Sequence, residues 1–306
     1  MLSAIFSSGC TIDLILDREN NRQCGIVNAL EKRQEKRKTA LIFNNYEDVS
    51  GTAVINISPA RKLEHYGIRV ELIGQLNVYK DTNVPYCFFA IFKDLDSPGC
   101  LYESKTYHWK LQGVEKEYET YWGVNVSVRY FVRLCVVQKY GSTLMKEVDL
   151  IVQNPVQIVP ESEKVKMEFV LQKVGIEGCL HIEFEYDKLY YHLKDVVRGK
   201  INFLLVRIKL KYMEIHIVKT ETVKGSYQQY TTTDIIGKFE VMDGSPLKLE
   251  CIPVRLYLCC YDLTPTYNNI QNRYSVKYYL NIVLVDEEER RYFKRHDITL
   301  YRKEIT

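Results

Sequence analysis

Hydrophobic and polar residues alternate along much of this chain, and one alternating segment occurs twice. SVRYFVRLCVV (127–137) and SVKYYLNIVLV (275–285) have the same order of residue kinds, 148 positions apart. Successive side chains of a strand point to opposite faces, so each segment predicts a strand with one buried face. Such half-buried strands are typical of antiparallel sheets.

A second pair of segments supports an internal duplication. EDVSGTAVINI (47–57) and KDVVRGKINF (194–203) each run from Asp-Val through a glycine into a strand pattern, and their glycines, Gly51 and Gly199, are again 148 positions apart. Two matches at one offset indicate that the two halves of the chain repeat one structure.

The domain boundary is predicted between the two repeats. The segment QNPVQIVPESEK (153–164) holds two of the eight prolines and predicts an extended linker. Short alternating strands separated by turns such as SPG and MDG are typical of an all-β sandwich. We therefore predict an all-β fold with two antiparallel β-sandwich domains in tandem, an N-terminal one at 1–156 and a C-terminal one at 157–306.

Composition and cysteine usage indicate a cytoplasmic protein. The chain is 46% hydrophobic and 26% charged, as in ordinary globular proteins. It shows no secretory leader, and no apolar stretch reaches the ~18 residues of a membrane span. The nine cysteines include no CxxC pair, so we expect free thiols. Cys135, Cys259 and Cys260 lie in apolar runs and are expected to be buried and slow to react.

The net charge of +3 is too small to suggest a nucleic-acid partner. One dense basic cluster, KRQEKRK, contains Lys32, Arg33, Lys36, Arg37 and Lys38. We interpret it as a solvated loop, and the alternative is a patch that contacts an anionic membrane. The surrounding NALEKRQEKRK is compatible with either a helix or a hairpin.

Catalytic and metal-binding patterns are not found in the sequence. The six histidines have no metal-ligand spacing, although His216 is expected to share a strand face with Glu214. DLDSPG (94–99) departs from a calcium loop at Pro98. There is no phosphate-binding loop, nucleophile elbow or dinucleotide fingerprint. We predict a binding protein without catalytic residues, cofactor or metal.

Longer segments carry a specific family resemblance. The chain resembles the arrestin-like subunit of retromer, the vacuolar protein sorting 26 family, from about Cys10 to Glu304. The segments that carry it are LEHYGIRVELIGQ (63–75), VEKEYETYWGVNVSVRYF (114–131), GIEGCLHIEFEYDKLYYHLKDVVRGKINFLLVRIKLKYMEI (175–215), IPVRLYLCCYDLTPT (252–266) and RYSVKYYLNIVLVDEEERRYFKR (273–295).

The resemblance implies an arrestin-like, non-enzymatic subunit of the retromer cargo-selective complex, on the cytosolic face of endosomes. It implies binding to a large helical-solenoid subunit and, through the complex, association with a phosphoesterase-like subunit. A sorting nexin and cargo tail peptides are the further implied partners. The alternatives are another arrestin-like adaptor for receptor tails, or a module that binds phosphoinositides through the basic cluster.

Site residues are placed by combining this resemblance with the strand pattern. Asp243-Gly244 is a tight-turn signal, so GKFEVMDGSPLKLECIPVRLYL (237–258) predicts a hairpin. Val241 and Met242 precede the turn and point to opposite faces, so at least one is expected to project outward. The resemblance assigns large-subunit binding to Val241, Met242, Asp243 and Gly244. It assigns cargo and sorting-nexin binding to Val174 and Phe293.

The chain departs from the family pattern at a few positions. About five additional residues lie around 169–173, directly before Val174. Asn45 and Pro155 stand where animal members have an acid and a leucine that contact a PDZ-containing sorting nexin. Glu117 replaces a proline that is common in the family.

Overall fold

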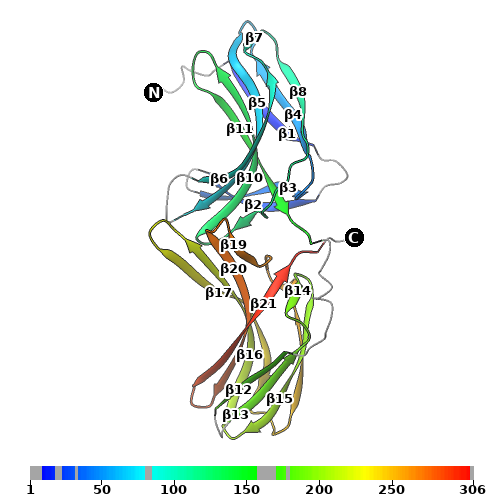
Figure 1. The fold of residues 1–306 in the computed structure, drawn as a ribbon, viewed down its shortest axis with the longest axis vertical. Coiled ribbons are helices and arrows are strands. Elements are labelled where there is room, and N and C mark those ends of the chain that lie inside the picture. The colour runs from blue at the N-terminus through cyan, green and yellow to red at the C-terminus, as the bar shows by residue number, and fades with distance from the viewer. Residues whose placement is uncertain are drawn as a thin grey trace. The chain divides into compact units, whose positions relative to one another are not determined.

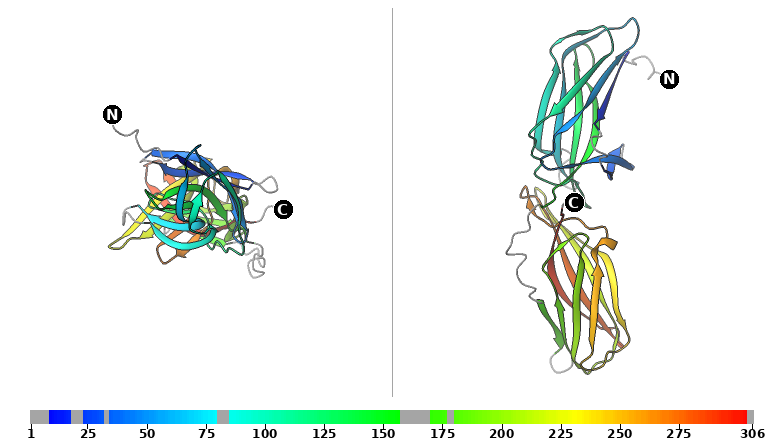
Figure 2. Two further views of the ribbon diagram at one scale, coloured as in Figure 1. Left: turned by 90° about the horizontal axis from the view of Figure 1, so that it is seen from above. Right: turned by 90° about the vertical axis from the view of Figure 1, so that its right-hand side faces the viewer.

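The computed structural model describes residues 9–17, 23–31, 34–79, 85–156, 170–176 and 180–303, with side chains except those of 26–31, 34–38 and 170–176. The chain divides into two compact units, Met1–Asn154 and Pro155–Thr306. Strands make up nearly all the regular structure of the described residues, which confirms the all-β prediction (Figure 1). Each unit consists of two layers of strands (Figure 2).

The first unit has a small sheet in the order β1-β4-β8 and a large one in the order β2-β3-β11-β10-β5-β6, with β7 on β5 and β9 on β10. Its strands are β1 (Cys10–Leu16), β2 (Cys24–Glu31), β3 (Gln34–Asn44), β4 (Val49–Ile57), β5 (Leu63–Val78), β6 (Tyr86–Asp96), β7 (Gly99–Leu101), β8 (Lys105–Leu111), β9 (Tyr121–Trp122), β10 (Val126–Gln138) and β11 (Leu144–Gln153).

The second unit has one sheet in the order β12-β13-β15-β18 and another in the order β14-β21-β20-β16-β17, with β19 on β20. Its elements are β12 (Val170–Ile176), β13 (Leu180–Tyr186), β14 (Tyr190–His192), β15 (Val196–Val206), β16 (Leu210–Lys224), β17 (Gln229–Asp243), β18 (Cys251–Tyr257), the 3-10 turn η2 (Leu258–Cys260), β19 (Tyr267–Ile270), β20 (Tyr274–Asp286) and β21 (Arg291–Tyr301).

The two duplicated segments lie on equivalent strands, as predicted. They form most of β10 and β20, each of which has two long antiparallel neighbours, β5 and β11 in one unit and β16 and β21 in the other. Each large sheet also contains one parallel pair, β3–β11 and β14–β21. The edge strands β6 and β17 are equivalent in the same way.

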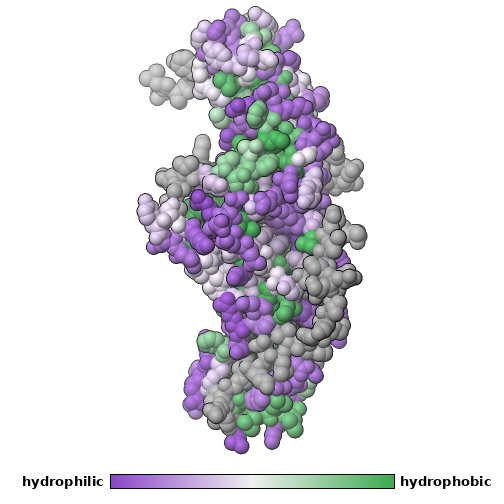
Figure 3. All heavy atoms as spheres, viewed as in Figure 1, coloured by the Kyte–Doolittle hydropathy of each residue, from purple (hydrophilic) through white to green (hydrophobic). Residues whose placement is uncertain are grey.

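Equivalent tyrosines occupy the middle of the two cores. Tyr130 and Tyr278 are almost fully buried on the inner faces of β10 and β20. The hydroxyl of Tyr130 accepts the backbone N–H of Tyr118 at 3.2 Å, and that of Tyr278 accepts the N–H of Thr264 at 3.1 Å. A buried hydroxyl without a partner is costly, so each tyrosine fixes a nearby loop to its core. On the face drawn in Figure 3, hydrophilic residues surround smaller hydrophobic areas, as expected for two such cores.

The predicted hairpin at 237–258 is wrong. β17 pairs with β16, whereas β18 pairs with β15 in the other sheet. The chain does turn at Gly244, which has a φ of +95°, but residues 244–250 then carry it across to the other sheet. A turn dipeptide indicates where the chain reverses, whereas the partner of the next strand is decided by packing between the sheets.

The basic cluster and two of the cysteines also differ from expectation. Lys36, Arg37 and Lys38 lie in β3, which forms a hairpin with β2, so this part is not a loop; Lys32 and Arg33 lie outside the described residues. Cys135 is buried as expected, but Cys259 and Cys260 are exposed. The reason is that β18 ends at Tyr257 and the 3-10 turn η2 buries Leu258 instead.

Candidate functional site

Three connections of the second unit meet at one end of its sandwich, and we call this region the loop end. They are residues 207–209, 244–250 and 287–290. The backbone N–H of Gly244 donates to the carbonyl of Lys211 at 2.6 Å, and that of Glu287 donates to the carbonyl of Lys209 at 3.1 Å. Residues 209–211, where the connection 207–209 enters β16, are therefore hydrogen-bonded to the connections 244–250 and 287–290.

Val241 and Met242 lie where β17 reaches the loop end. β17 is the last strand in the order of its sheet, and its register with β16 shifts here, so that Met242 faces Met213 while Glu240 faces Glu214. Val241 falls within this irregularity. Both Val241 and Met242 are half-buried, because an edge strand that bends at a bulge does not enclose its side chains fully.

The segment 244–250 adds two apolar side chains that the sequence reasoning missed. Leu247 is 76% exposed and Leu249 is 70% exposed. Two backbone hydrogen bonds fix this segment to β15. The N–H of Leu249 donates to the carbonyl of Phe203 at 2.7 Å, and the N–H of Phe203 donates to the carbonyl of Glu250 at 2.9 Å. The alternation in Leu247-Lys248-Leu249 was the available signal, but the hairpin prediction assigned no role to these side chains.

Asp286 organises the turn between β20 and β21. Its carboxylate accepts the N–H groups of Glu288 and Arg290 at 3.0 and 2.9 Å, the Arg290 Nε at 2.8 Å and the Tyr292 hydroxyl at 2.9 Å. Desolvation alone would raise the pKa of Asp286, but these hydrogen bonds and the charge of Arg290 outweigh it and lower the pKa to about 2. The carboxylate is therefore ionised at neutral pH, where it holds the turn in place.

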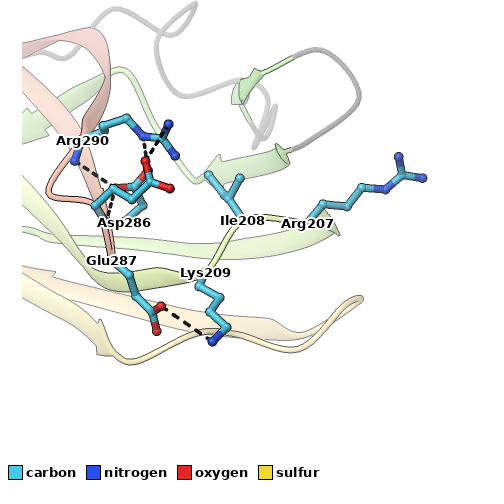
Figure 4. A pocket seen from close by; sticks show the side chains of 7 residues that line it. Arg207, Ile208, Lys209, Asp286, Glu287 and Arg290 are labelled. Atoms are coloured by element: carbon cyan, nitrogen blue, oxygen red, sulfur yellow. Dashed lines mark hydrogen bonds and ion pairs between the residues drawn. The ribbon is translucent and has the colours of Figure 1, made fainter.

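A small pocket of about 260 Å³ lies beside this turn (Figure 4). Its acids are matched by bases, with Lys209 3.7 Å from Glu287 and Arg290 3.0 Å from Glu288. Arg207 extends away from these pairs in Figure 4. A catalytic acid needs a raised pKa, whereas the pKa of Asp286 is lowered. The pocket is thus lined by paired charges, and Asp286 is not a candidate general acid. It is lined by Arg207, Ile208, Lys209, Asp286, Glu287, Glu288 and Arg290.

The two residues assigned to cargo and nexin contacts lie in different sheets of the second unit. Phe293 is on β21 opposite Val283, and it is 72% exposed. Val174 is on β12, opposite Ile182, at the end of its sheet order. The side chains of Val174 and of residues 170–173 before it are not described, and residue 169 lies outside the described part of the chain.

Histidine and metal chemistry offer no further site among the described residues. The ring Nε2 of His216 lies 2.6 Å from the carboxylate of Glu214, which confirms that these two side chains share a face. No group of three or more His, Cys, Asp or Glu in the described part is arranged to hold a metal ion. Over the same residues, no helix is long and apolar enough to cross a membrane.

The duplicated units and the loop end define an arrestin-like protein built from two β-sandwiches. Comparison with known proteins identifies the particular family. Residues 6–289 match the family model of vacuolar protein sorting-associated protein 26, and the chain belongs to this family.

Several relatives are similar over their whole length or nearly so. Vacuolar protein sorting-associated protein 26 of Plasmodium falciparum is 54% identical over 307 residues, covering 100% of both chains. The protein of the same name from Dictyostelium discoideum is 45% identical, covering 98% of this chain and 84% of its own. Vacuolar protein sorting-associated protein 26B of Arabidopsis thaliana is 45% identical, covering 98% and 97%.

Proposed function

We propose that this protein is a non-enzymatic subunit of the retromer cargo-selective complex, which returns membrane cargo from endosomes to the Golgi and the plasma membrane. Its membership in a vacuolar protein sorting family supports this class of process. The observation that carries the proposal is the group of apolar side chains presented at the loop end. Its members are Val241, Met242, Leu247 and Leu249.

This apolar group suits a helical-solenoid partner. Stacked helical repeats present grooves between their helices, and a few apolar side chains at the centre of an interface supply most of the binding energy. Charged residues surround the group, including Asp243 and the pairs of Lys209 with Glu287 and Lys211 with Glu289. An apolar centre with a charged rim is the usual composition of a specific interface.

Cargo binding would use a different part of the second unit. β12 is an edge strand, and an extended cargo tail adds to such an edge through its backbone. Val174 on this strand and the exposed Phe293 would then contact the tail together with a sorting nexin. The phosphoesterase-like subunit would join through the complex, and the whole would lie peripherally on the cytosolic face of endosomes.

Calorimetry against the purified large subunit tests the docking surface. Replacing Val241 and Met242 together by Asp should weaken binding by at least ~3 kcal/mol, because the interface would bury unpaired charge. Ile235→Asp is the matched control, since Ile235 is an exposed apolar residue on the same strand, roughly 20 Å away along β17. Wild-type affinity of a double variant whose thermal melt is unchanged would contradict the proposed surface.

Co-purification separates retromer from the alternatives. A helical-repeat subunit and a phosphoesterase-like subunit should be recovered with the tagged chain from cytosol, and their absence would favour another arrestin-like adaptor. Replacing Lys36, Arg37 and Lys38 of β3 by Gln, together with Lys32 and Arg33, tests the phosphoinositide module. Loss of salt-sensitive liposome binding by the isolated subunit would support that module instead.

A further inference from the structure

The edge strand β6 of the first unit carries features that the proposed function does not use. In the order of its sheet β6 is the last strand, and β5 is the only strand with which the described residues pair it. The register between them is unbroken from Phe89 to Asp94, opposite Arg69–Gly74. An edge of this kind presents a row of backbone N–H and C=O groups to an incoming strand.

The composition of β6 is unusual for an exposed edge. Its sequence is YCFFAIFKDLD, and Phe92 is 62% exposed on it. The equivalent edge strand β17 begins with the polar run QYTTTD. Proteins ordinarily blunt an apolar edge with charges, and β6 carries only Lys93 before its acidic end. Exposed apolar surface on an edge strand is a mark of a binding site.

A small acidic pocket opens beside this strand. It has a volume of about 240 Å³ and is lined by Phe88, Phe89, Glu115 and Glu117. The ring of Phe88 is held by edge-on contacts with Tyr118 and Tyr130, whose centroids lie at 5.4 and 5.6 Å. Small-molecule sites usually measure roughly 300–1,000 Å³, so this pocket has the size of a single side chain.

The two carboxylates are turned outward by the residue between them. Lys116 is fully buried, and its ammonium donates to the backbone carbonyls of Glu47 at 2.6 Å and Val114 at 3.4 Å. Because neighbouring residues of an extended segment point in opposite directions, Glu115 and Glu117 project into solvent. Among the described residues neither is in an ion pair, and Glu115 accepts a hydrogen bond from the Tyr46 hydroxyl at 3.2 Å.

We propose that β6 binds an extended segment of a partner protein by strand addition, with an arginine or lysine of that segment entering the pocket between the phenylalanines and Glu115 and Glu117. Aromatic faces and carboxylates together favour a cationic side chain, since the ring attracts the cation and the acids pair with it. Backbone pairing along Phe89–Asp94 would supply affinity, and the basic side chain would set the register. This site lies in the first unit and does not depend on the proposed retromer docking.

A displayed library of random nonapeptides, selected on the full chain, provides the probe. The enriched peptides should share one Lys or Arg within an alternating, β-branched sequence. The tightest-binding peptide is then synthesised in two forms, one with its Lys or Arg and one with norleucine at the same position. The double variant Glu115→Gln, Glu117→Gln should bind the basic peptide at least tenfold more weakly than the wild type does. Its affinity for the norleucine peptide should be unchanged. Glu103→Gln, an exposed glutamate of the same unit, is the control and should change neither.

N-methylation of the peptide tests the strand addition separately from the fold of the protein. In a strand, alternate N–H groups point to the same side, so methylation of one alternate set should abolish binding and methylation of the other set should not. The proposal is overturned if no binders emerge, if they show no basic position, if the glutamine variant binds them equally, or if both methylated forms bind. A dimer in light scattering that depends on Glu115 and Glu117 would also overturn it, since a second copy would then occupy the edge.

Discussion

Gly51 and Gly199 occupy the same position in the two units, and each allows a neighbouring strand to approach more closely than a side chain would permit. Both lie on strands flanked by equivalent partners, β4 between β1 and β8, and β15 between β13 and β18. A Cβ on Gly51 would lie 2.3 Å from the carbonyl oxygen of Ile15, and a Cβ on Gly199 would lie 2.4 Å from that of Glu185. The contacted carbonyl belongs to the preceding partner strand in both units.

Gly51→Ala and Gly199→Ala should therefore each lower the free energy of unfolding by about 1–3 kcal/mol, because a backbone carbonyl must move to admit the methyl group. Urea denaturation measures this. Gly99→Ala is the control, because its nearest neighbour would be 3.7 Å away, and it should change stability by less than about 0.5 kcal/mol. If Gly51→Ala and Gly199→Ala were as stable as Gly99→Ala and the wild type, the close approach of the neighbouring strand to these glycines would have no energetic consequence.

These glycines show how much of the fold the sequence could predict. Alternation identified β10 and β20, and the constant offset of Gly51 and Gly199 identified the duplication, because both signals depend on local geometry and repeat within one chain. The partner of β18 was not predictable in this way. After Gly244 the chain has equal local freedom to return beside β17 or to cross to the other sheet, and packing between the sheets selects the crossing.

The same distinction between local features and packing applies to the residues of the candidate sites. The place of Val241 and Met242 at a strand end before a turn was predictable because such an end can be recognised locally, whereas their binding role came from the family resemblance and stays a prediction. The exposure of Leu247 and Leu249 was not predicted, because it depends on how residues 244–250 carry the chain across to the other sheet. Burial of Lys116 was unpredictable for another reason: a lysine is ordinarily exposed, and only the assembled unit provides the carbonyls of Glu47 and Val114 that satisfy it.

Asp286 should make stability depend on pH in the acid range. Its pKa is about 2 in the folded protein, whereas an unfolded aspartate has a pKa of about 3.9. The unfolded state therefore takes up the proton first as pH falls, and the contribution of Asp286 is complete above about pH 5 and is lost between about pH 5 and 2. Asp286→Asn should be less stable than the wild type at pH 7, and the difference should shrink over that range.

Denaturant melts of wild type and variant at several pH values measure this difference. Asp297→Asn is a suitable control, because the Asp297 side chain is 78% exposed and its contact with Arg295 is long, at 3.4 Å. Exposed pairs of this kind contribute about 0–1 kcal/mol, so the control should follow the wild type closely. A constant difference between Asp286→Asn and wild type from pH 7 to pH 2 would contradict the assigned ionisation.

Cysteine alkylation should separate exposed from buried thiols. Burial raises the pKa of both Cys10 and Cys135 and shields them, so both should stay unmodified by iodoacetamide at pH 8 in the native protein. Cys259 and Cys260 should react, with Cys260 the slower because its hydrogen bond to Cys259 raises its pKa. Peptide mass spectrometry provides the rates, and labelling in urea confirms that every thiol can react. Labelling of Cys135 as fast as Cys259 would contradict the structure.

Leu249 adopts a backbone conformation that is unfavourable for its type. Its φ is +69°, in the left-handed region, which costs a residue with a Cβ roughly 1–2 kcal/mol. The conformation is held by the hydrogen bond from its N–H to Phe203 and brings its side chain into solvent beside the proposed docking residues. The folded chain therefore carries backbone strain at Leu249, whose side chain is exposed.

Leu249→Gly should consequently raise the free energy of unfolding by up to about 1 kcal/mol, the strain it releases less the greater freedom that glycine has in the unfolded chain. Leu249→Ala keeps a Cβ at the same φ, so its stability should equal that of the wild type. If Leu249 belongs to the docking surface, both variants should bind the large solenoid subunit more weakly to the same extent, because both lack the apolar side chain. Chemical denaturation and calorimetry on the three proteins give both quantities. Unchanged affinity in both variants would remove Leu249 from the interface, and an unchanged stability of Leu249→Gly would contradict the strain.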